Sequence, residues 1–220
     1  MAGDRPKICA TVTGHDPAAV KSVAALVDLF EVRIDIIGGQ WPEVIKYIKK
    51  PWIACNRRPE EGGQWKGSEP DRIGELRRAL KLGAAIVDIE LGTPGIHGII
   101  KEIKGRAECL LSYHDLEVTP ALEKMYNIVK DQLAAGADIC KVVTTARSFA
   151  DNLAVLRLIT AFPGQRVVAF AMGSGGYASR VLCPLVGGYL TYASVAAGRE
   201  SAAGQITAAD LRKIYGMLGK

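Results

Sequence analysis

Residues 31–36 read Glu-Val-Arg-Ile-Asp-Ile, in which charged and apolar side chains alternate strictly. Side chains of a β-strand point alternately to its two faces, so the segment is expected to place Glu31, Arg33 and Asp35 on one face and the apolar residues on the other. A strand of an open parallel sheet with helices on both faces would be apolar throughout. The alternation therefore favours a closed barrel, whose charged strand faces point to a shared interior.

The same pattern recurs on later segments of the chain. Asp88 and Glu90 share one face of a fourth candidate strand, Ser112 and His114 share one face of a fifth, and Lys141 lies in a sixth. Buried charges are tolerated where they pair or do chemistry, and residues near the carboxyl ends of barrel strands line the usual active site. These side chains mark the expected site.

Eight short apolar segments alternate with segments of helical period, with no linker or internal repeat between them. The expected strands are 7–12, 30–36, 52–56, 85–91, 109–113, 139–143, 167–171 and 188–193, and the expected helices include 18–28, 70–82, 119–135 and 148–160. Pro120 is expected in the first turn of the 119–135 helix and Gly136 at its end. At about 25 to 30 residues per unit, the chain is predicted to form a single (β/α)8 barrel domain over residues 1–220.

The composition is that of an ordinary globular protein, with 49% hydrophobic and 23% charged residues. A net charge of +5 is too small to indicate nucleic acid or a membrane surface as the partner, but it is compatible with an anionic small molecule. The five cysteines form no C-x-x-C pair, and four of them, which lie in apolar segments, are expected to be buried thiols: Cys9, Cys55, Cys109 and Cys140. The uncharged stretch 181–198 is interrupted by Pro and Gly, so a helix end followed by a buried strand is expected there instead of a membrane helix. The polar residues 1–7 do not resemble a signal peptide, so the cytoplasm is the expected location of the protein.

Lys141 is the sharpest chemical signal, because residues 137–143 (Ala-Asp-Ile-Cys-Lys-Val-Val) surround it with small and apolar side chains. Burial is expected to lower its pKa and to leave a neutral amine that can form an imine with a ketone. The alternative is a lysine that only pairs with an interior carboxylate such as Glu90.

His114 ends the strand that precedes the lysine strand, where a histidine is suited to proton transfer. His15 and His97 are expected on the surface, and three histidines without a shared face predict no metal site. Glycines after the third strand, in 55–63, are expected to bring Glu61 back over the site. The segment 172–180 fits either a phosphate-binding glycine loop or a carboxylate clamp made by Arg180.

Together these residues resemble one known family, type I 3-dehydroquinate dehydratase. The resemblance runs through Lys141 and the segments 7–10, 31–35, 57–63, 87–90, 112–115, 172–180 and 201–205. It implies a (β/α)8 barrel, a homodimer, and no metal or organic cofactor. It also implies syn loss of water from 3-dehydroquinate, the third step of the shikimate pathway, through a Schiff base. Because few residues precede Lys7, a compact form without the N-terminal hairpin of longer members is expected.

The resemblance assigns roles residue by residue. Lys141 becomes the imine-forming lysine, His114 the proton shuttle and Glu61 the group that orients the histidine. The matching substrate-binding residues are Glu31, Arg33 and Arg57 for the ring hydroxyls, Arg180 for the carboxylate, Ser201 and Gln205 in a closing loop, Met172 and Tyr192 as apolar contacts, and Thr11 at the mouth. Tyr192 replaces the phenylalanine of some relatives, and Ala203 replaces the usual proline of the closing loop.

Two alternatives remain open from the residues alone. One is another imine-forming barrel such as a class I aldolase, which would cleave a carbon–carbon bond. The other is a catalytically silent barrel that binds a carboxylate through its arginines. The pairing of His114 with Lys141 beside an arginine, without a clear phosphate cradle, favours dehydration.

Overall fold

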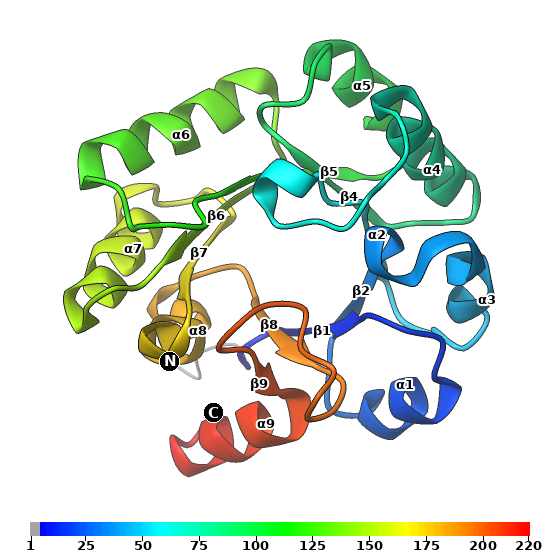
Figure 1. Ribbon diagram of the computed structural model, residues 1–220. Coiled ribbons are helices and arrows are strands. Elements are labelled where there is room, and N and C mark those ends of the chain that lie inside the picture. Colours follow the sequence, from blue (N-terminus) through cyan, green and yellow to red (C-terminus); the bar gives the residue numbers. More distant parts are fainter. Residues whose placement is uncertain (1–4) are drawn as a thin grey trace.

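The computed structural model describes residues 5–220, and its parallel strands curl around a central axis with the helices outside (Figure 1). Within these residues the strands form one sheet in the order β7-β6-β5-β4-β3-β2-β1-β8-β9. They are β1 (Ile8–Val12), β2 (Leu29–Arg33), β3 (Trp52–Cys55), β4 (Ile86–Glu90), β5 (Glu108–His114), β6 (Ile139–Thr145), β7 (Val167–Met172), β8 (Thr191–Ser194) and β9 (Ile206–Thr207). The Tyr189 N–H donates to the Val167 carbonyl at 2.9 Å and links the segment before β8 to β7, so the predicted barrel is confirmed.

The helices follow the strands in alternation. They are α1 (Pro17–Val23), α2 (Ile34–Ile37), α3 (Trp41–Ile45), α4 (Glu69–Lys81), α5 (Ile96–Ile103), α6 (Leu122–Ala135), α7 (Phe149–Ala161), α8 (Tyr177–Leu182) and α9 (Ala208–Met217), with short 3₁₀ turns η1 (Gly38–Gln40), η2 (Pro59–Glu61), η3 (Ser174–Gly176) and η4 (Cys183–Val186). Side-chain caps begin several of them: Asp16 accepts from the first N–H groups of α1, and Ser148 forms a capping box with Asp151 at α7.

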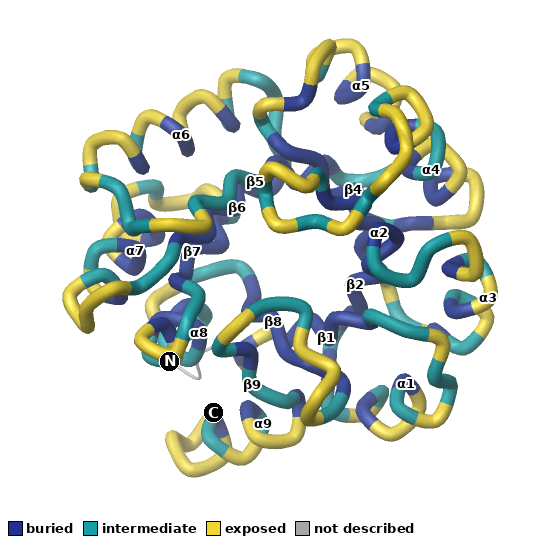
Figure 2. The backbone as a smooth tube through the Cα atoms, in the orientation of Figure 1, coloured by how far each residue is buried: buried dark blue, intermediate teal, exposed yellow. Residues whose placement is uncertain are grey.

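The apolar core lies in two places. One layer fills the space between strands and helices, where Val32, Leu76 and Ile89 are buried, and Figure 2 shows the strands buried and the outer turns of the helices exposed. The second cluster contains Leu29 and Ile53 together with residues of the outer helices α6 and α7, such as Val129 and Leu158. The four cysteines expected to be buried thiols are buried and unpaired, and so is Cys183.

Several expected boundaries were wrong. Strand β2 ends at Arg33 rather than at residue 36, because the chain turns directly into α2. Asp35 is therefore helical, although it stays buried and accepts two hydrogen bonds from Arg33. Helix α1 ends at Val23 rather than at residue 28, and Asp28 instead accepts from the Ile8 N–H at 2.8 Å.

Helix α6 also begins later than expected. Pro120 lies before the helix, which starts at Leu122, and the Thr119 hydroxyl donates to the Thr145 carbonyl instead of joining a helical turn. Gly136 ends α6 at a φ of 104°, as predicted. The short strand β9 was not expected from the sequence, because two residues are too few to show a period.

The remaining fold predictions concern the chain ends and the membrane. The uncharged stretch 181–198 contains the end of α8, η4 and β8, as expected. None of the helices described is long and apolar enough to cross a membrane. The expected absence of an N-terminal hairpin falls partly on residues 1–4, which lie outside the described part, and from Arg5 the chain leads directly into β1.

Candidate active site

A cavity of about 300 Å³ opens at the carboxyl ends of the barrel strands. It is lined by Arg33, Cys55 and His114, each the last residue of its strand. The other residues around it are Glu31, Arg57, Glu61, Gly62, Leu116, Lys141, Val143, Thr145, Phe170, Met172, Gly173, Arg180, Tyr192, Ser201, Ala202, Ala203 and Gln205. Of the residues to which the resemblance assigns a role, all except Thr11 line this cavity, whereas Asp88, Glu90 and Ser112 do not line it. The volume is within the usual range for a small-molecule site.

Lys141 lines this cavity and is 4% exposed. Its Nζ lies 2.8 Å from Asp88 Oδ2, 3.5 Å from Glu31 Oε1 and 4.2 Å from the centre of the Tyr192 ring. The expected fall of its pKa was wrong. Burial alone would lower the pKa of Lys141, but the carboxylates of Asp88 and Glu31 outweigh burial and raise it. Lys141 therefore rests as an ammonium ion, and its partner is Asp88 rather than Glu90.

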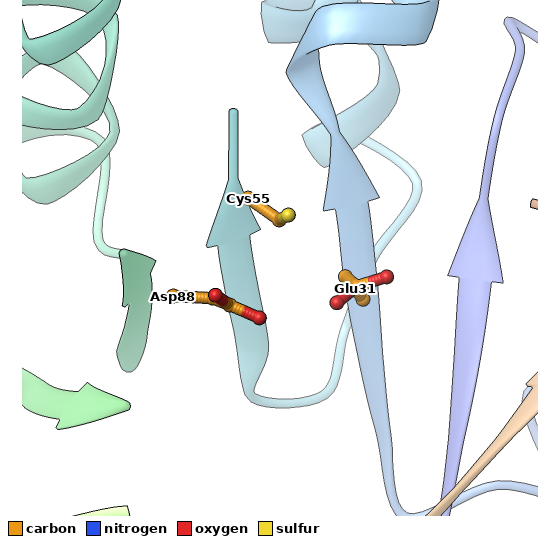
Figure 3. A group of neighbouring side chains, drawn as sticks. All are labelled: Glu31, Cys55 and Asp88. Carbon is orange, nitrogen blue, oxygen red and sulfur yellow. The ribbon is translucent and has the colours of Figure 1, made fainter. Parts of the chain in front are cut away.

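Glu31, Cys55 and Asp88 project from the neighbouring strands β2, β3 and β4 (Figure 3). The atoms of these side chains that could bind a metal lie within 4.8 Å of one another. This group was missed from the sequence, because only the histidines were considered as metal ligands. The protein supplies its own cations here, since Lys141 contacts both carboxylates and Arg57 Nη2 lies 2.8 Å from Asp88 Oδ2. Burial also raises the pKa of Cys55, so this residue is a thiol, which is a weaker metal ligand than a thiolate.

Arg57 joins two carboxylates of β4. Its Nη1 donates to Glu90 Oε1 at 2.9 Å, and its Nη2 forms the ion pair with Asp88. Ser112 completes this group by donating its hydroxyl to Asp88 Oδ1 at 2.6 Å. Burial by itself would lower the pKa of Arg57, but Asp88 and Glu90 raise it well above its usual value. The cations and carboxylates on this side of the cavity therefore neutralise one another.

His114 and Glu61 form a second pair at the mouth. Glu61 Oε2 lies 2.8 Å from His114 Nδ1 and accepts the His114 backbone N–H at 3.0 Å. The loop between β3 and α4 delivers Glu61 as expected, and Gly63 is required there because a Cβ at this position would lie 1.9 Å from the Arg57 carbonyl oxygen. Burial raises the pKa of Glu61 to about 7, and burial together with Arg57 holds the pKa of His114 well below its usual range. His114 is thus a neutral imidazole near pH 7.

Arg180 occupies the opposite wall and is 2% exposed. In the part of the chain that the structure describes, its guanidinium meets no carboxylate and its Nε has no hydrogen-bond partner. It lies over the Phe170 ring, 4.4 Å from the centre, and Nη2 donates to the Ala203 carbonyl at 3.5 Å. Burial lowers the pKa of Arg180 to about 10, which still leaves it charged at neutral pH. A buried cation that meets no carboxylate among the described residues is a candidate site for an anion.

The loop before β9 closes the cavity from above. Gln205 Oε1 accepts the Ser201 N–H at 2.8 Å, and Gln205 Nε2 donates to Thr11 Oγ1 at 3.1 Å. Thr11 therefore lies behind Gln205 and supports the loop instead of lining the cavity. Ala203 accepts a hydrogen bond from the Gly173 N–H at 3.1 Å, which ties the loop to the end of β7.

Several participants were missed from the sequence. Phe170 and Cys55 line the cavity, and their inward orientation follows from strand alternation with Met172 and Ile53. Arg72 was missed because it lies on α4 outside the barrel, and nothing in its local sequence separates it from exposed helix arginines. It is fully buried and its Nη1 donates to Glu90 Oε2 at 2.8 Å.

Comparisons with known proteins agree with this geometry. The family model of type I 3-dehydroquinase matches residues 8–220. A 3-dehydroquinate dehydratase of Dehalococcoides mccartyi is 41% identical over 210 residues, which cover 96% of this chain and 95% of the relative. That of Methanocaldococcus jannaschii is 36% identical over 197 residues and covers 88% of each chain. The crystal structure of 3-dehydroquinate dehydratase from Geobacillus kaustophilus matches with a TM-score of 0.85 at 26% identity, over 99% of this chain and 92% of that one. The chain belongs to the type I 3-dehydroquinate dehydratase family.

Proposed function

We propose that the protein dehydrates 3-dehydroquinate to 3-dehydroshikimate, and that it does so through an imine on Lys141. The observation that carries the mechanism is a buried lysine in a cavity that is also lined by a neutral histidine and by an arginine with no acidic partner among the described residues. Dehydration is the activity named for the relatives, which favours loss of water over aldol cleavage. The presence of both Lys141 and His114 argues against a silent binding barrel.

The charge around Lys141 suits an imine intermediate. The ammonium first releases a proton so that its nitrogen can attack the ketone, and the carbinolamine hydroxyl then leaves with a proton as water. The overall change converts an ammonium and a ketone to a protonated imine and one water, so the positive charge on nitrogen is the same before and after condensation. Asp88 and Glu31 hold this charge as an ammonium in the free protein. The same carboxylates therefore stabilise the protonated imine at the substrate's C3, and the raised pKa of Lys141 is consistent with this role.

His114 provides the proton transfers. In its neutral form it takes a proton from C2, the C2–H electrons form the enamine double bond, and the imine nitrogen becomes neutral. The C1–O bond then breaks as His114 returns the proton to the leaving hydroxyl, which departs as water while the protonated imine re-forms. Hydrolysis consumes one water and releases 3-dehydroshikimate and the ammonium of Lys141. The balance is one substrate to one product and one water.

Substrate binding follows the division of charge in the cavity. The substrate carboxylate pairs with Arg180, the described buried arginine that meets no carboxylate of the protein. Glu31, Arg33 and Arg57 face the ring hydroxyls as donors and acceptors. Ser201 and Gln205 close over the substrate, and Met172 and Tyr192 pack against its ring; Thr11 acts indirectly, through Gln205.

The test is reductive trapping. The purified protein is incubated with 3-dehydroquinate and borohydride, and a peptide containing Lys141 is expected to gain one reduced ligand per chain while activity is lost. Protein treated with borohydride alone is the control and is expected to stay active. A modification at another lysine, such as the exposed Lys7, would contradict the assignment.

We further propose a homodimer located in the cytoplasm, which the family resemblance implies. Sedimentation of the purified protein is expected to give twice the chain mass of 23.5 kDa. A particle with the mass of one chain at catalytic concentrations would contradict the dimer.

A further inference from the structure

A continuous chain of ion pairs, buried from Arg72 inward, leads from the outside of the barrel to Lys141. It begins on helix α4, where Glu69 Oε1 accepts from Arg72 Nη2 at 2.8 Å. Arg72 Nη1 donates to Glu90 Oε2 at 2.8 Å. Glu90 then holds Arg57 at 2.9 Å, Arg57 pairs with Asp88 at 2.8 Å, and Asp88 holds Lys141 at 2.8 Å. Positive and negative groups alternate along its whole length.

We propose that Arg72 is a positioning residue for the dehydration: from outside the barrel it holds Glu90 and, through Glu90, fixes the guanidinium of Arg57 against Asp88. Arg72 does not line the cavity, so it acts indirectly, through Glu90 and through the backbone that precedes Arg57. The importance of the far end, Lys141, rests on the imine proposed above.

Glu90 is the link that makes Arg72 necessary. The carboxylate is fully buried, and its two oxygens are used separately. Oε1 accepts from Arg57 Nη1 and from the Arg58 backbone N–H at 3.1 Å, whereas Oε2 accepts from Arg72, with the Thr93 hydroxyl farther away at 3.5 Å. Without Arg72, one oxygen of a buried carboxylate would lose its charged donor. Glu90 would then rotate or take up a proton, and either change would release Arg57.

Arg72 also fixes the backbone from which Arg57 projects. Its Nη1 donates to the Asn56 carbonyl at 2.7 Å, and the Asn56 side chain donates back to the Arg72 carbonyl at 3.1 Å. Arg72 thus holds both the residue before Arg57 and the carboxylate that Arg57 binds. A planar guanidinium with several donors in fixed directions can do this, while the single ammonium of a lysine cannot reach all these acceptors.

The experiment compares Arg72→Met with Arg77→Met. Both arginines lie on α4 and form bidentate ion pairs, but Arg77 pairs at the surface with Glu102, which is not a member of the chain. We expect Arg72→Met to lower kcat by about 10- to 100-fold, since small displacements of reacting groups cost that much. KM should change less, because Arg180 is untouched. Arg77→Met should keep wild-type kcat, and Arg72→Lys should recover part of the loss.

The readout that separates positioning from general support of α4 is coupling to Glu90. In a Glu90→Gln background, Arg72→Met should lower kcat by only about threefold or less, because the link is already broken. An equal loss in both backgrounds would overturn the proposal. So would a loss of turnover fully accounted for by the unfolded fraction in circular dichroism, or wild-type kcat in Arg72→Met.

Two further outcomes are kept distinct. If Arg72→Met does not fold, Arg72→Lys is compared with Arg77→Lys, and a several-fold lower kcat in the first is expected; equal kcat values would overturn the proposal. If wild-type protein forms no borohydride adduct at Lys141, the imine is wrong, but coupling between Arg72 and Glu90 in kcat is still measurable and decides the positioning role alone.

Discussion

Arg57 and Arg180 face the same cavity, are both almost fully buried, and differ in their partners. Arg57 meets two carboxylates on β4, and they raise its pKa. Among the described residues Arg180 meets none, and burial lowers its pKa to about 10. Carboxylates of the protein therefore balance the charge of Arg57, whereas no described carboxylate balances the charge of Arg180.

The difference indicates that a bound ligand supplies negative charge at Arg180. A buried arginine with no acidic partner carries a desolvation cost that only a ligand offsets, so the Arg180 wall is built for an anion. On the Arg57 side, by contrast, carboxylates of the protein already pair with the arginine and with Lys141, the residue at which we propose the imine. Three experiments test this difference between the two sides of the cavity.

The largest effect is expected on the chemical side of the cavity. His114→Ala should lower kcat by about 10²- to 10⁴-fold, the usual value of one positioned proton-transfer group. The substrate adduct on Lys141 should still accumulate under borohydride, because imine formation uses the lysine and imine hydrolysis uses the histidine. Mass spectrometry checks this, with Lys141→Ala as the matched variant that should lose both turnover and adduct. Unchanged turnover in His114→Ala would refute the division of roles.

The second prediction tests the two arginines directly. Arg57→Met should lower the free energy of unfolding by about 3 to 5 kcal/mol, because it leaves buried carboxylates without a cation. Arg180→Met breaks no described ion pair and should change that free energy by less than about 1 kcal/mol. It should instead raise KM by about 10- to 100-fold, since a charge-assisted bond to the substrate carboxylate is lost. Urea unfolding and steady-state kinetics provide the two measurements.

Equal losses of folding stability in Arg57→Met and Arg180→Met would show that the ion pairs of Arg57 do not contribute to the free energy of unfolding. A KM for Arg180→Met equal to that of the wild type would place the substrate carboxylate elsewhere.

The smallest effect concerns pH and the Glu61–His114 pair. The pKa of Glu61 is raised to about 7 by burial, so this carboxyl is protonated below pH 7 and ionised above it. Ionised Glu61 accepts a hydrogen bond from the N–H at His114 Nδ1, so Nε2 carries no proton and is free to act as a base. Protonated Glu61 instead donates a hydrogen bond to Nδ1, and the ring proton then lies on Nε2. The kcat/KM should therefore rise with pH through about 7. In Glu61→Gln the rise of kcat/KM near pH 7 should disappear, and the maximal kcat/KM should be lower. A rise that stays at the same pH in this variant would show that a group other than Glu61 titrates.

Much of the fold and of the site could be predicted from local sequence. The alternation in residues 31–36, the apolar setting of Lys141 and the glycines after Arg57 are each visible within a few residues, and each fixes a strand face or a turn. Because the inward faces of all strands meet at one axis, these local facts together placed the site residues around one cavity.

The errors have a common physical origin. The pKa of Lys141 depends on Asp88, which is 53 residues away, and on Glu31, which is 110 residues away. Thr11 contacts Gln205 across 194 residues, and Arg72 reaches Glu90 from another layer of the barrel. Element ends were also misplaced, because turns such as that at Arg33 depend on where the chain must go next.

Local sequence was enough to predict the strand faces and the barrel, because the periodicity of side chains along a strand is a local property. Only the tertiary structure decided which charges are paired: Lys141 with Asp88, Arg57 with two carboxylates, and Arg180 with none among the described residues. Pairing is a matter of a few ångströms between distant segments, and in a buried cavity those few ångströms set whether a group is an ammonium, a neutral base or an open anion site.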